Sequence, residues 1–292
     1  MFNIHPEFDD AILEARNLPA FSAQFVGELQ TLTNENLNVH DLTQHIRLDP
    51  ALTARILRVA NSPFFGMQRK IDSVDEAVML IGLRHTRGLV IAGAVMSALR
   101  PQPKSGLDIT AYWRSTLATA AAAQALSHHV SASTDSAFIT GILHDIGKLM
   151  MAVTWESQYL EVSRLMQLEN IPCHIAEERV FGYNHARLGA ALCERWWLPN
   201  AICYAISAHH LEKRPVNPEI AQESLASVLT LADSLAPALP HKANTEQDQH
   251  LALDVQAMQE LNLNRETVLH MLPDMRLSYL SLCQLVHIEN ES

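Results

Sequence analysis

The sequence predicts an all-α protein. Apolar residues recur at helical spacing, and alternating β-branched runs bounded by Asn-Gly or Asp-Gly turns are missing. Runs rich in Ala, Leu and Met are Ala51–Ala60, Thr110–Leu126, Ala137–Val153 and Ser224–Leu239. We therefore expect a multi-helix bundle.

Three polar residues are predicted to begin helices: Asn38, Ser73 and Asn264. Ser73 stands three residues before Glu76, which is the spacing of a capping box, and the apolar run Ala77–Leu83 follows. These caps support the helical prediction, because their side chains satisfy the free amides of a first turn.

Three breaker-rich or polar stretches are predicted connections: Pro101–Gly106, Glu212–Pro218 and His241–His250. They suggest an N-terminal helical lobe over residues 1–105, a second helical lobe over 106–240 and a C-terminal helical extension over 241–292. The extension is either a closing helical pair against the second lobe or part of a homodimer surface.

Composition excludes several classes of protein. Hydrophobic residues make up 48% of the chain and charged residues 18%, so a disordered chain is excluded. The net charge of −11 argues against a broad nucleic-acid-binding surface. Four cysteines without a Cys-x-x-Cys pair favour a reduced, cytoplasmic setting. No signal peptide is apparent, and the longest apolar stretch, Gly88–Leu99, has about 12 residues where a membrane span needs roughly 18–20.

The most informative segment is Ala137–Val153, which carries His144, Asp145 and Lys148 inside an otherwise apolar helix. Burying an ionised carboxylate without partners is very costly, so Asp145 requires a cation, a set of donors or a metal. His144 and Asp145 together offer one nitrogen and one oxygen ligand, which suits Zn, Fe or Mn. Lys148 lies one turn from His144 and can face the same site.

Further candidate ligands follow along the chain. His185 stands at the predicted start of a helix, His209 and His210 end an apolar stretch, and Asp233 is a lone carboxylate among apolar neighbours. If these helices pack as one bundle, four histidines and two carboxylates converge. Inward-facing histidines and carboxylates can hold one or two metal ions in a bundle core.

Several motifs, in order, resemble a known family. GILHDIGKLMM is similar to the His-Asp motif of the HD superfamily, which includes metal-dependent phosphohydrolases. Five segments resemble the signature of HDOD domains: Leu48–Ser62, Ile71–Leu83, His185–Gly189, Trp196–Pro199 and His209–His210. The resemblance runs from Leu18 to Asp233 and implies an HD-like helical bundle. HDOD domains are output or regulatory modules of bacterial signalling, and for most members no catalytic activity is established.

The resemblance also implies roles for individual residues. The metal ligands of the cyclic-dinucleotide phosphodiesterase branch, HD-GYP, correspond to His144, Asp145, His185, His209, His210 and Asp233. Lys148 matches a position associated with the phosphate, so Lys148 and Asp145 are the catalytic candidates of an active enzyme. Two features depart from that branch: the upstream histidine position falls at Ser115, and no Gly-Tyr-Pro element follows the paired histidines. The site therefore lacks one ligand of the family pattern.

Structural explanations stay open beside these roles. His144 and Asp145 can be a hydrogen-bonded pair retained from an enzyme ancestor, and His185 and Asp233 can likewise be structural. His209 and His210 fit a helix end, where an imidazolium gains from the dipole. Lys148 can be a surface lysine with a buried stem.

We predict a non-catalytic HDOD module of cytoplasmic signalling, whose site holds one or two Fe, Mn or Zn ions. Its expected partner is a signalling protein or a small phosphorylated ligand, with neither membrane nor broad nucleic-acid contact. One alternative is a metal-dependent phosphohydrolase acting on a phosphoester or a cyclic dinucleotide. The other is a purely structural interaction protein.

Overall fold

The computed structural model describes residues 23–33, 37–61, 69–99, 101–130, 132–211, 221–241 and 248–286. These residues form helices and connections with no strand among them, which confirms the all-α prediction. The predicted connection Glu212–Pro218 lies outside the described residues, and so does most of His241–His250.

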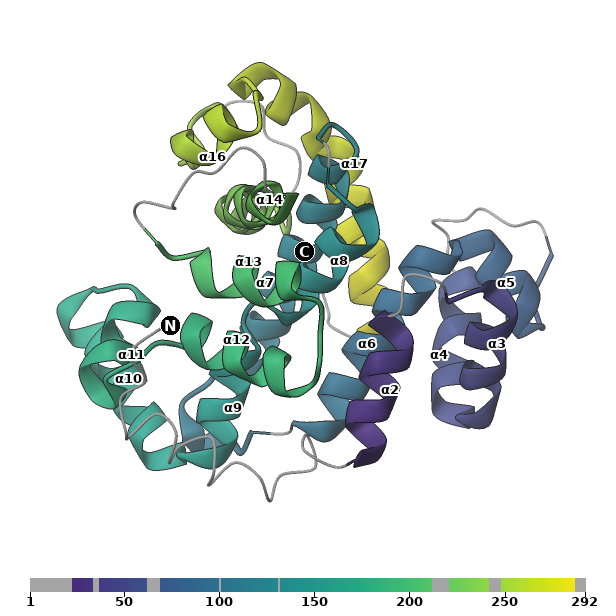
Figure 1. The fold of residues 1–292 in the computed structure, drawn as a ribbon, viewed down its shortest axis with the longest axis horizontal. Helices are drawn as coiled ribbons and strands as arrows, with labels where there is room; N and C mark the ends of the chain where they lie inside the picture. The colour runs from purple at the N-terminus through teal and green to yellow at the C-terminus, as the bar shows by residue number, and fades with distance from the viewer. Residues whose placement is uncertain are drawn as a thin grey trace.

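The N-terminal helices form one side of the molecule (Figure 1). They are α2 (Ala23–Thr33), α3 (Val39–Leu48), α4 (Pro50–Ala60), α5 (Val74–Ile81) and α6 (Leu83–Ala98). Helices α3, α4 and α5 pack on one another, and α6 joins them to the rest of the molecule by packing against α8 (Thr134–Leu143).

Helix α7 (Ile109–Ser127) is the centre of the remaining bundle, where α8, α14 (Ala221–Leu235) and α17 (Arg265–Val286) pack against it (Figure 1). The other elements that follow α7 are α9 (Ile146–Thr154), α10 (Glu156–Glu169), α11 (Cys173–Phe181), α12 (His185–Arg195), α13 (Asn200–Ala208), η5 (Ala236–Ala238) and α16 (Val255–Glu260). A short turn, η4 (Pro103–Ser105), lies within the predicted connection before α7.

The three predicted caps are present. The Asn38 side chain accepts from the Asp41 amide, Ser73 accepts from the Glu76 amide, and Asn264 accepts from the Thr267 amide. These bonds satisfy amides that have no partner inside their helices.

One predicted helix is in fact two. The apolar run Ala137–Val153 breaks at His144 and Asp145, which separate α8 from α9, so these residues do not lie inside a continuous helix. Consecutive side chains on one helix diverge by about 100°. The break frees His144 and Asp145 from that constraint, and both side chains turn toward the same place.

Glycine at position 147 allows α9 to approach the start of α12. A β-carbon at Gly147 would lie 2.1 Å from the carbonyl oxygen of His185, a distance that no real contact permits. Helix α9 therefore sits directly against the first residue of α12, and this holds Asp145 beside His185.

The C-terminal segment packs on the second lobe. Helix α17 lies against α7, and α16 lies against α14. The buried guanidinium of Arg276 donates to the Ala238 carbonyl and pairs with Asp248 at 2.6 Å, which ties α17 to the end of η5. Helix α17 also packs against α4 and α6. The closing helical pair and the homodimer surface both stay predictions.

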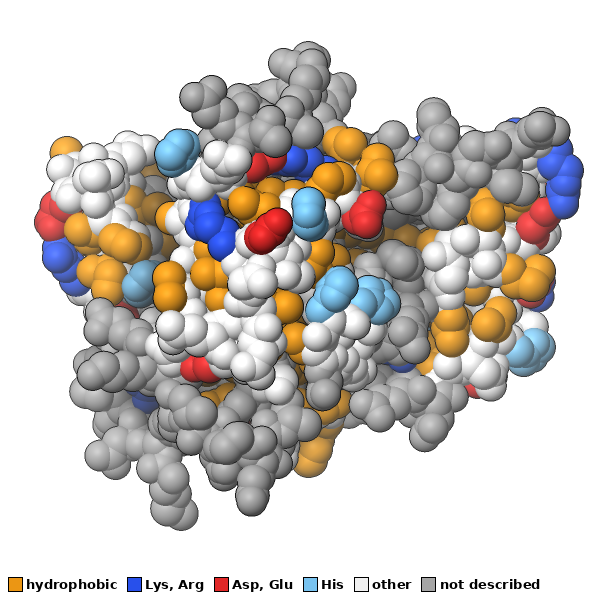
Figure 2. Space-filling view, turned by 90° about the horizontal axis from the view of Figure 1, so that it is seen from above, with side chains coloured by type: hydrophobic (Ala, Val, Ile, Leu, Met, Phe, Trp, Pro, Cys, Tyr) orange, Lys and Arg blue, Asp and Glu red, His pale blue; other side chains and the backbone are white. Residues whose placement is uncertain are grey.

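Among the described residues, the stretch Ser136–Thr154, which spans α8 and α9, is long and apolar enough to pass a composition test for a membrane span. Within the fold 83% of it is buried, so the apolar composition matches a core position. On the described part of the face in Figure 2, acidic, basic and hydrophobic side chains are interspersed.

Candidate functional site

The structure brings together every candidate ligand named from the sequence. His144 and Asp145 come from the break between α8 and α9, and His185 is the first residue of α12. His209 and His210 follow α13, and Asp233 lies on α14. Helices far apart in the chain thus contribute to one cluster, which we call the His-Asp cluster.

The carboxylate of Asp145 is the centre of the His-Asp cluster. Its Oδ2 lies 2.6 Å from Lys148 Nζ and 3.4 Å from His144 Nε2. Its Oδ1 lies 3.1 Å from His185 Nε2 and 4.0 Å from His209 Nε2. Burial would raise the pKa of Asp145, but His144, Lys148 and His185 hold it well below its usual value. Asp145 is therefore a buried carboxylate anion surrounded by nitrogen donors.

His144 and His209 have matching orientations. The Nδ1–H of His144 donates to the Gly141 carbonyl at 2.8 Å, and that of His209 donates to the Ile206 carbonyl at 2.6 Å. A carbonyl only accepts, so the proton is on Nδ1 and both Nε2 atoms face the cluster. Both Nε2 atoms are buried and make no hydrogen bond to any described residue, although carboxylate oxygens of Asp145 and Asp233 lie 3.4 and 3.5 Å from His144 Nε2.

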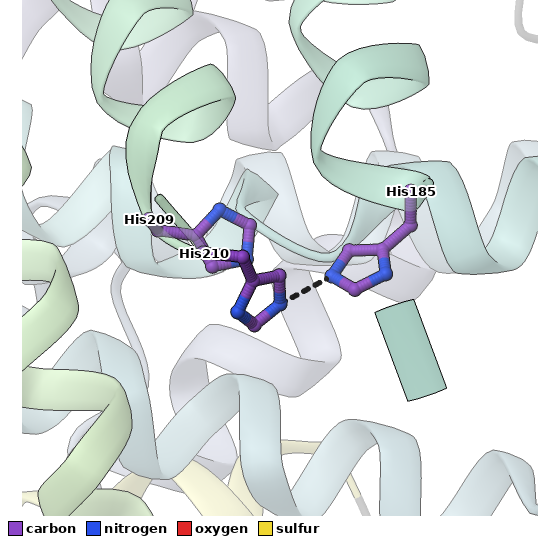
Figure 3. A group of neighbouring side chains, drawn as sticks. All are labelled: His185, His209 and His210. Carbon is purple, nitrogen blue, oxygen red and sulfur yellow. Dashed lines mark hydrogen bonds between the residues drawn. The ribbon is translucent and has the colours of Figure 1, made fainter. Parts of the chain in front are cut away.

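His185 and His210 complete the nitrogen set (Figure 3). The Nε2 atoms of these two residues lie 2.9 Å apart. Ligand atoms of His185, His209 and His210 all lie within 4.8 Å of one another. The His210 ring also stacks on His174, with centroids 4.3 Å apart.

Asp233 and helix α7 line the part of the site next to His144. Asp233 Oδ1 lies 3.5 Å from His144 Nε2, and the Thr119 hydroxyl donates to the same oxygen at 3.5 Å. Tyr112 lies close enough for burial and the Asp145 charge to raise the pKa of its hydroxyl well above the usual value. The α7 side chains that interact with these carboxylates, Tyr112 and Thr119, thus carry hydroxyl groups. Ser115, which stands where the family pattern has a histidine, is half-buried on the same helix.

The four histidines differ in their affinity for protons. Burial would lower the pKa of His185, but Glu177 and Asp145 raise it above its usual value. Burial would lower the pKa of His144, but Asp145 and Asp233 raise it to about 10. Burial, His185 and His144 together lower the pKa of His209 to about 3. Burial and the neighbouring His209 and His185 also lower the pKa of His210. Without a metal the cluster thus combines a charged His144 with neutral His209 and His210.

Sequence reasoning missed the contribution of α11. Glu177 is fully buried, and its Oε2 lies 2.5 Å from His185 Nδ1. Cys173 donates to Glu177 Oε1 at 3.3 Å, and His174 stacks on His210. The sequence does place Cys173, His174 and Glu177 within about one turn of a helix. That spacing does not reveal which face of α11 turns inward.

The donor set fits a divalent transition metal. Within the part of the chain that the structure describes, three buried atoms make no hydrogen bond: His144 Nε2, His209 Nε2 and Asp145 Oδ1. Their charged neighbours lie at 3.1–4.0 Å. Buried polar atoms without partners are rare in folded proteins and call for an explanation such as an ion. Imidazole nitrogens combined with carboxylate oxygens suit Fe, Mn or Zn.

Comparison with known proteins identifies the family and the related folds. The HDOD domain model matches residues 18–212. An uncharacterized protein of Treponema pallidum (strain Nichols) is 27% identical over 261 residues, covering 86% of this chain and 49% of that protein. The chain thus spans about half the length of the curated relative it matches.

Three crystal structures have a similar fold. An HDOD domain protein with unknown function from Geobacter sulfurreducens has a TM-score of 0.75 and 20% identity, covering 95% of this chain and 98% of its own. A candidate signal transduction protein from Marinobacter aquaeolei VT8 has a TM-score of 0.76 and 20% identity, covering 99% and 67%. A candidate phosphohydrolase from Shewanella amazonensis SB2B has a TM-score of 0.73 and 24% identity, covering 94% and 97%.

Proposed function

Because this chain belongs to the HDOD domain family, we propose that it is a regulatory module of bacterial signalling that binds a divalent transition metal and does not turn over a substrate. The metal is Fe, Mn or Zn, as one or two ions. The proposed ligands are His144, Asp145, His185, His209, His210 and Asp233. The metal-loaded site then recognises a small phosphorylated ligand or a signalling protein.

The observation that carries this proposal is the set of three buried atoms without hydrogen-bond partners. His144 Nε2 and His209 Nε2 each face the cluster because Nδ1 is held by a backbone carbonyl. Metal-binding histidines typically have their second nitrogen fixed in this way. A buried polar group that makes no hydrogen bond costs about 1–3 kcal/mol, and a bound cation would lower that cost for each atom that coordinates it.

Binding without turnover is favoured by the α7 side of the site. Where the family pattern has an upstream histidine, helix α7 carries Ser115, and its residues Tyr112 and Thr119 interact with the cluster carboxylates. Neutral hydroxyls are weaker ligands than imidazole for these metals. The protein would therefore supply one ligand fewer to a bound ion, which would leave a coordination position for a bound ligand.

The residues of the chain have distinct tasks in this proposal. A bound metal ion would act as a Lewis acid toward an oxygen of a phosphorylated ligand. Lys148, whose side chain is 20% exposed beside Asp145, supplies positive charge toward an anion that reaches the site. Asp145 and the histidines hold their donor atoms in place before the ligand arrives, since every one of them except His210 is buried.

The first test is the metal content of tag-free protein by plasma mass spectrometry, for the wild type and Asp145→Ala. The exposed His128→Ala variant is a matched control, since it removes a histidine far from the proposed ligands in sequence. We expect near-stoichiometric transition metal in the wild type and the control, and its loss in Asp145→Ala. No metal in any protein, even after loading with Zn, Mn or Fe, would overturn the proposal.

A second candidate function is a metal-dependent phosphohydrolase. It is favoured by Lys148, a cation at the edge of the cluster and partly open to solvent. Phosphate esters, nucleotides and cyclic dinucleotides should be assayed with Mn, Fe or Mg. Turnover that Asp145→Ala abolishes would establish the enzyme and reject the non-catalytic module.

A third candidate is a purely structural interaction protein. It requires His144→Ala and Asp145→Ala to change stability while leaving every cellular output and the metal content unchanged. The same metal measurement therefore separates it from the first candidate.

A further inference from the structure

Helix α11 contributes a buried carboxylate that lies outside the ligand set drawn from the sequence. Glu177 is fully buried, and its side chain meets three donors. Its Oε2 lies 2.5 Å from His185 Nδ1 and accepts from the His185 amide at 2.8 Å, while Oε1 accepts from the Cys173 thiol at 3.3 Å. The ring contact is made on Nδ1, whereas Nε2 of the same ring lies next to Asp145 and His210.

We propose that Glu177 is a positioning residue for the metal ligand His185, an inference that rests on the proposed metal site. By accepting the Nδ1–H proton, the carboxylate keeps that proton on Nδ1, so that Nε2 is the ring nitrogen that can bind a metal once it carries no proton. That Nε2 atom lies 3.1 Å from Asp145 Oδ1 and 2.9 Å from His210 Nε2, inside the cluster. A carboxylate on the outer nitrogen also makes the inner nitrogen a more basic ligand.

Glu177 holds both the backbone and the ring of His185. His185 is the first residue of α12, so its amide has no partner within the helix. Glu177 accepts both this amide and the ring Nδ1–H through one oxygen, and both main-chain and side-chain rotation of His185 are thereby restricted. The neighbouring Glu178 accepts from the Asn184 side chain at 2.7 Å and does not share these contacts.

The test compares two substitutions at position 177 with one at 178. Glu177→Gln keeps the shape and a carbonyl acceptor but removes the charge, whereas Glu177→Met removes the acceptor at similar volume. We expect metal affinity to fall about 10-fold in Glu177→Gln and up to about 100-fold in Glu177→Met. Glu178→Gln makes the same chemical change on the same helix and should leave the affinity unchanged. Wild-type affinity in a folded Glu177→Met protein would overturn the proposal.

A double-mutant cycle separates positioning from general support of the fold. If Glu177 acts through His185, then Glu177→Gln lowers metal affinity in the wild type but has no further effect in a His185→Ala background. Equal losses in both backgrounds would mean that Glu177 only stabilises the start of α12, and would reject the positioning role. If Glu177→Met fails to fold, the double-mutant cycle with Glu177→Gln and His185→Ala still tests the positioning role.

A measurement on metal-free protein distinguishes failure of the proposed metal site from failure of the proposed role of Glu177. Long-range ¹H–¹⁵N spectra of metal-free protein report which nitrogen of His185 carries the proton. We expect Nδ1–H in the wild type and Glu177→Gln, and a mixture including Nε2–H in Glu177→Met. If the wild type binds no metal, the proposed function fails, and an unchanged tautomer in Glu177→Met would then reject the role of Glu177 as well.

Discussion

The Nε2 atoms of His185 and His210 lie 2.9 Å apart, although one residue begins α12 and the other follows α13. Two nitrogen lone pairs repel at this distance unless a proton or a cation lies between them. In the metal-free cluster a proton therefore lies between these two nitrogen atoms. A metal at the proposed site would compete with protons for them.

Metal uptake should release protons. His144, with a pKa of about 10, is protonated at neutral pH and must lose its proton to become a ligand. We expect at least one proton released per ion and an affinity that rises about tenfold per pH unit between pH 7 and 9. Titration calorimetry in two buffers of different ionisation enthalpy measures the release. Equal heats in both buffers would contradict this expectation.

The stability of the metal-free protein should pass through a maximum near pH 6.5. The folded pKa of His209, about 3, lies below the unfolded value of 6.5, so its contribution is lost as pH falls below 6.5. Between pH 6.5 and 5 this amounts to about 2 kcal/mol. The folded pKa of His144, about 10, lies above its unfolded value, so its contribution is complete below pH 6.5 and is lost as pH rises through 10.

Urea unfolding of chelator-treated protein at pH 5, 6.5 and 8 measures this profile. His209→Gln should reduce the loss on the acid side, because the neutral amide has no proton to gain. A stability that still falls equally steeply from pH 6.5 to 5 in His209→Gln would exclude His209 as the cause.

Lys148→Met should separate metal binding from anion binding. The ammonium lies 2.6 Å from Asp145 Oδ2 and competes with a metal for that oxygen. We expect the variant to bind metal severalfold more tightly and inorganic phosphate at least tenfold more weakly than the wild type. Lys104→Met, which removes an exposed lysine paired with Glu156, is the matched control. Loss of metal from Lys148→Met would place the lysine in a structural role.

Gly147→Ala should disturb the cluster through the backbone. The added methyl would lie 2.1 Å from the His185 carbonyl oxygen, so α9 and α12 must move apart. We expect a destabilisation of about 1–3 kcal/mol and weaker metal binding. Gly27→Ala, also within a helix, has no described atom within 4 Å of its new β-carbon and should stabilise by about 0.5–1 kcal/mol. Thermal unfolding of both variants measures the difference.

Much of the fold was predictable because its signals are local. Asn38, Ser73 and Asn264 cap helices as predicted, since a cap depends on a few consecutive residues. The candidate ligands were also recognisable by residue type and apolar context, because a charged group among apolar neighbours requires a partner wherever it is buried. Their roles as ligands stay predictions.

The tertiary structure alone decided how these residues meet. The break at His144 and Asp145 interrupts an apolar run that local spacing predicts as one helix, because packing against α12 and α14 sets the ends of α8 and α9. The contact of Glu177 with His185 depends on the rotation of α11 about its own axis. Local sequence specifies that α11 is a helix with a carboxylate on it. Which face turns inward is set by the combined packing of all its neighbours, and that is a property of the whole fold.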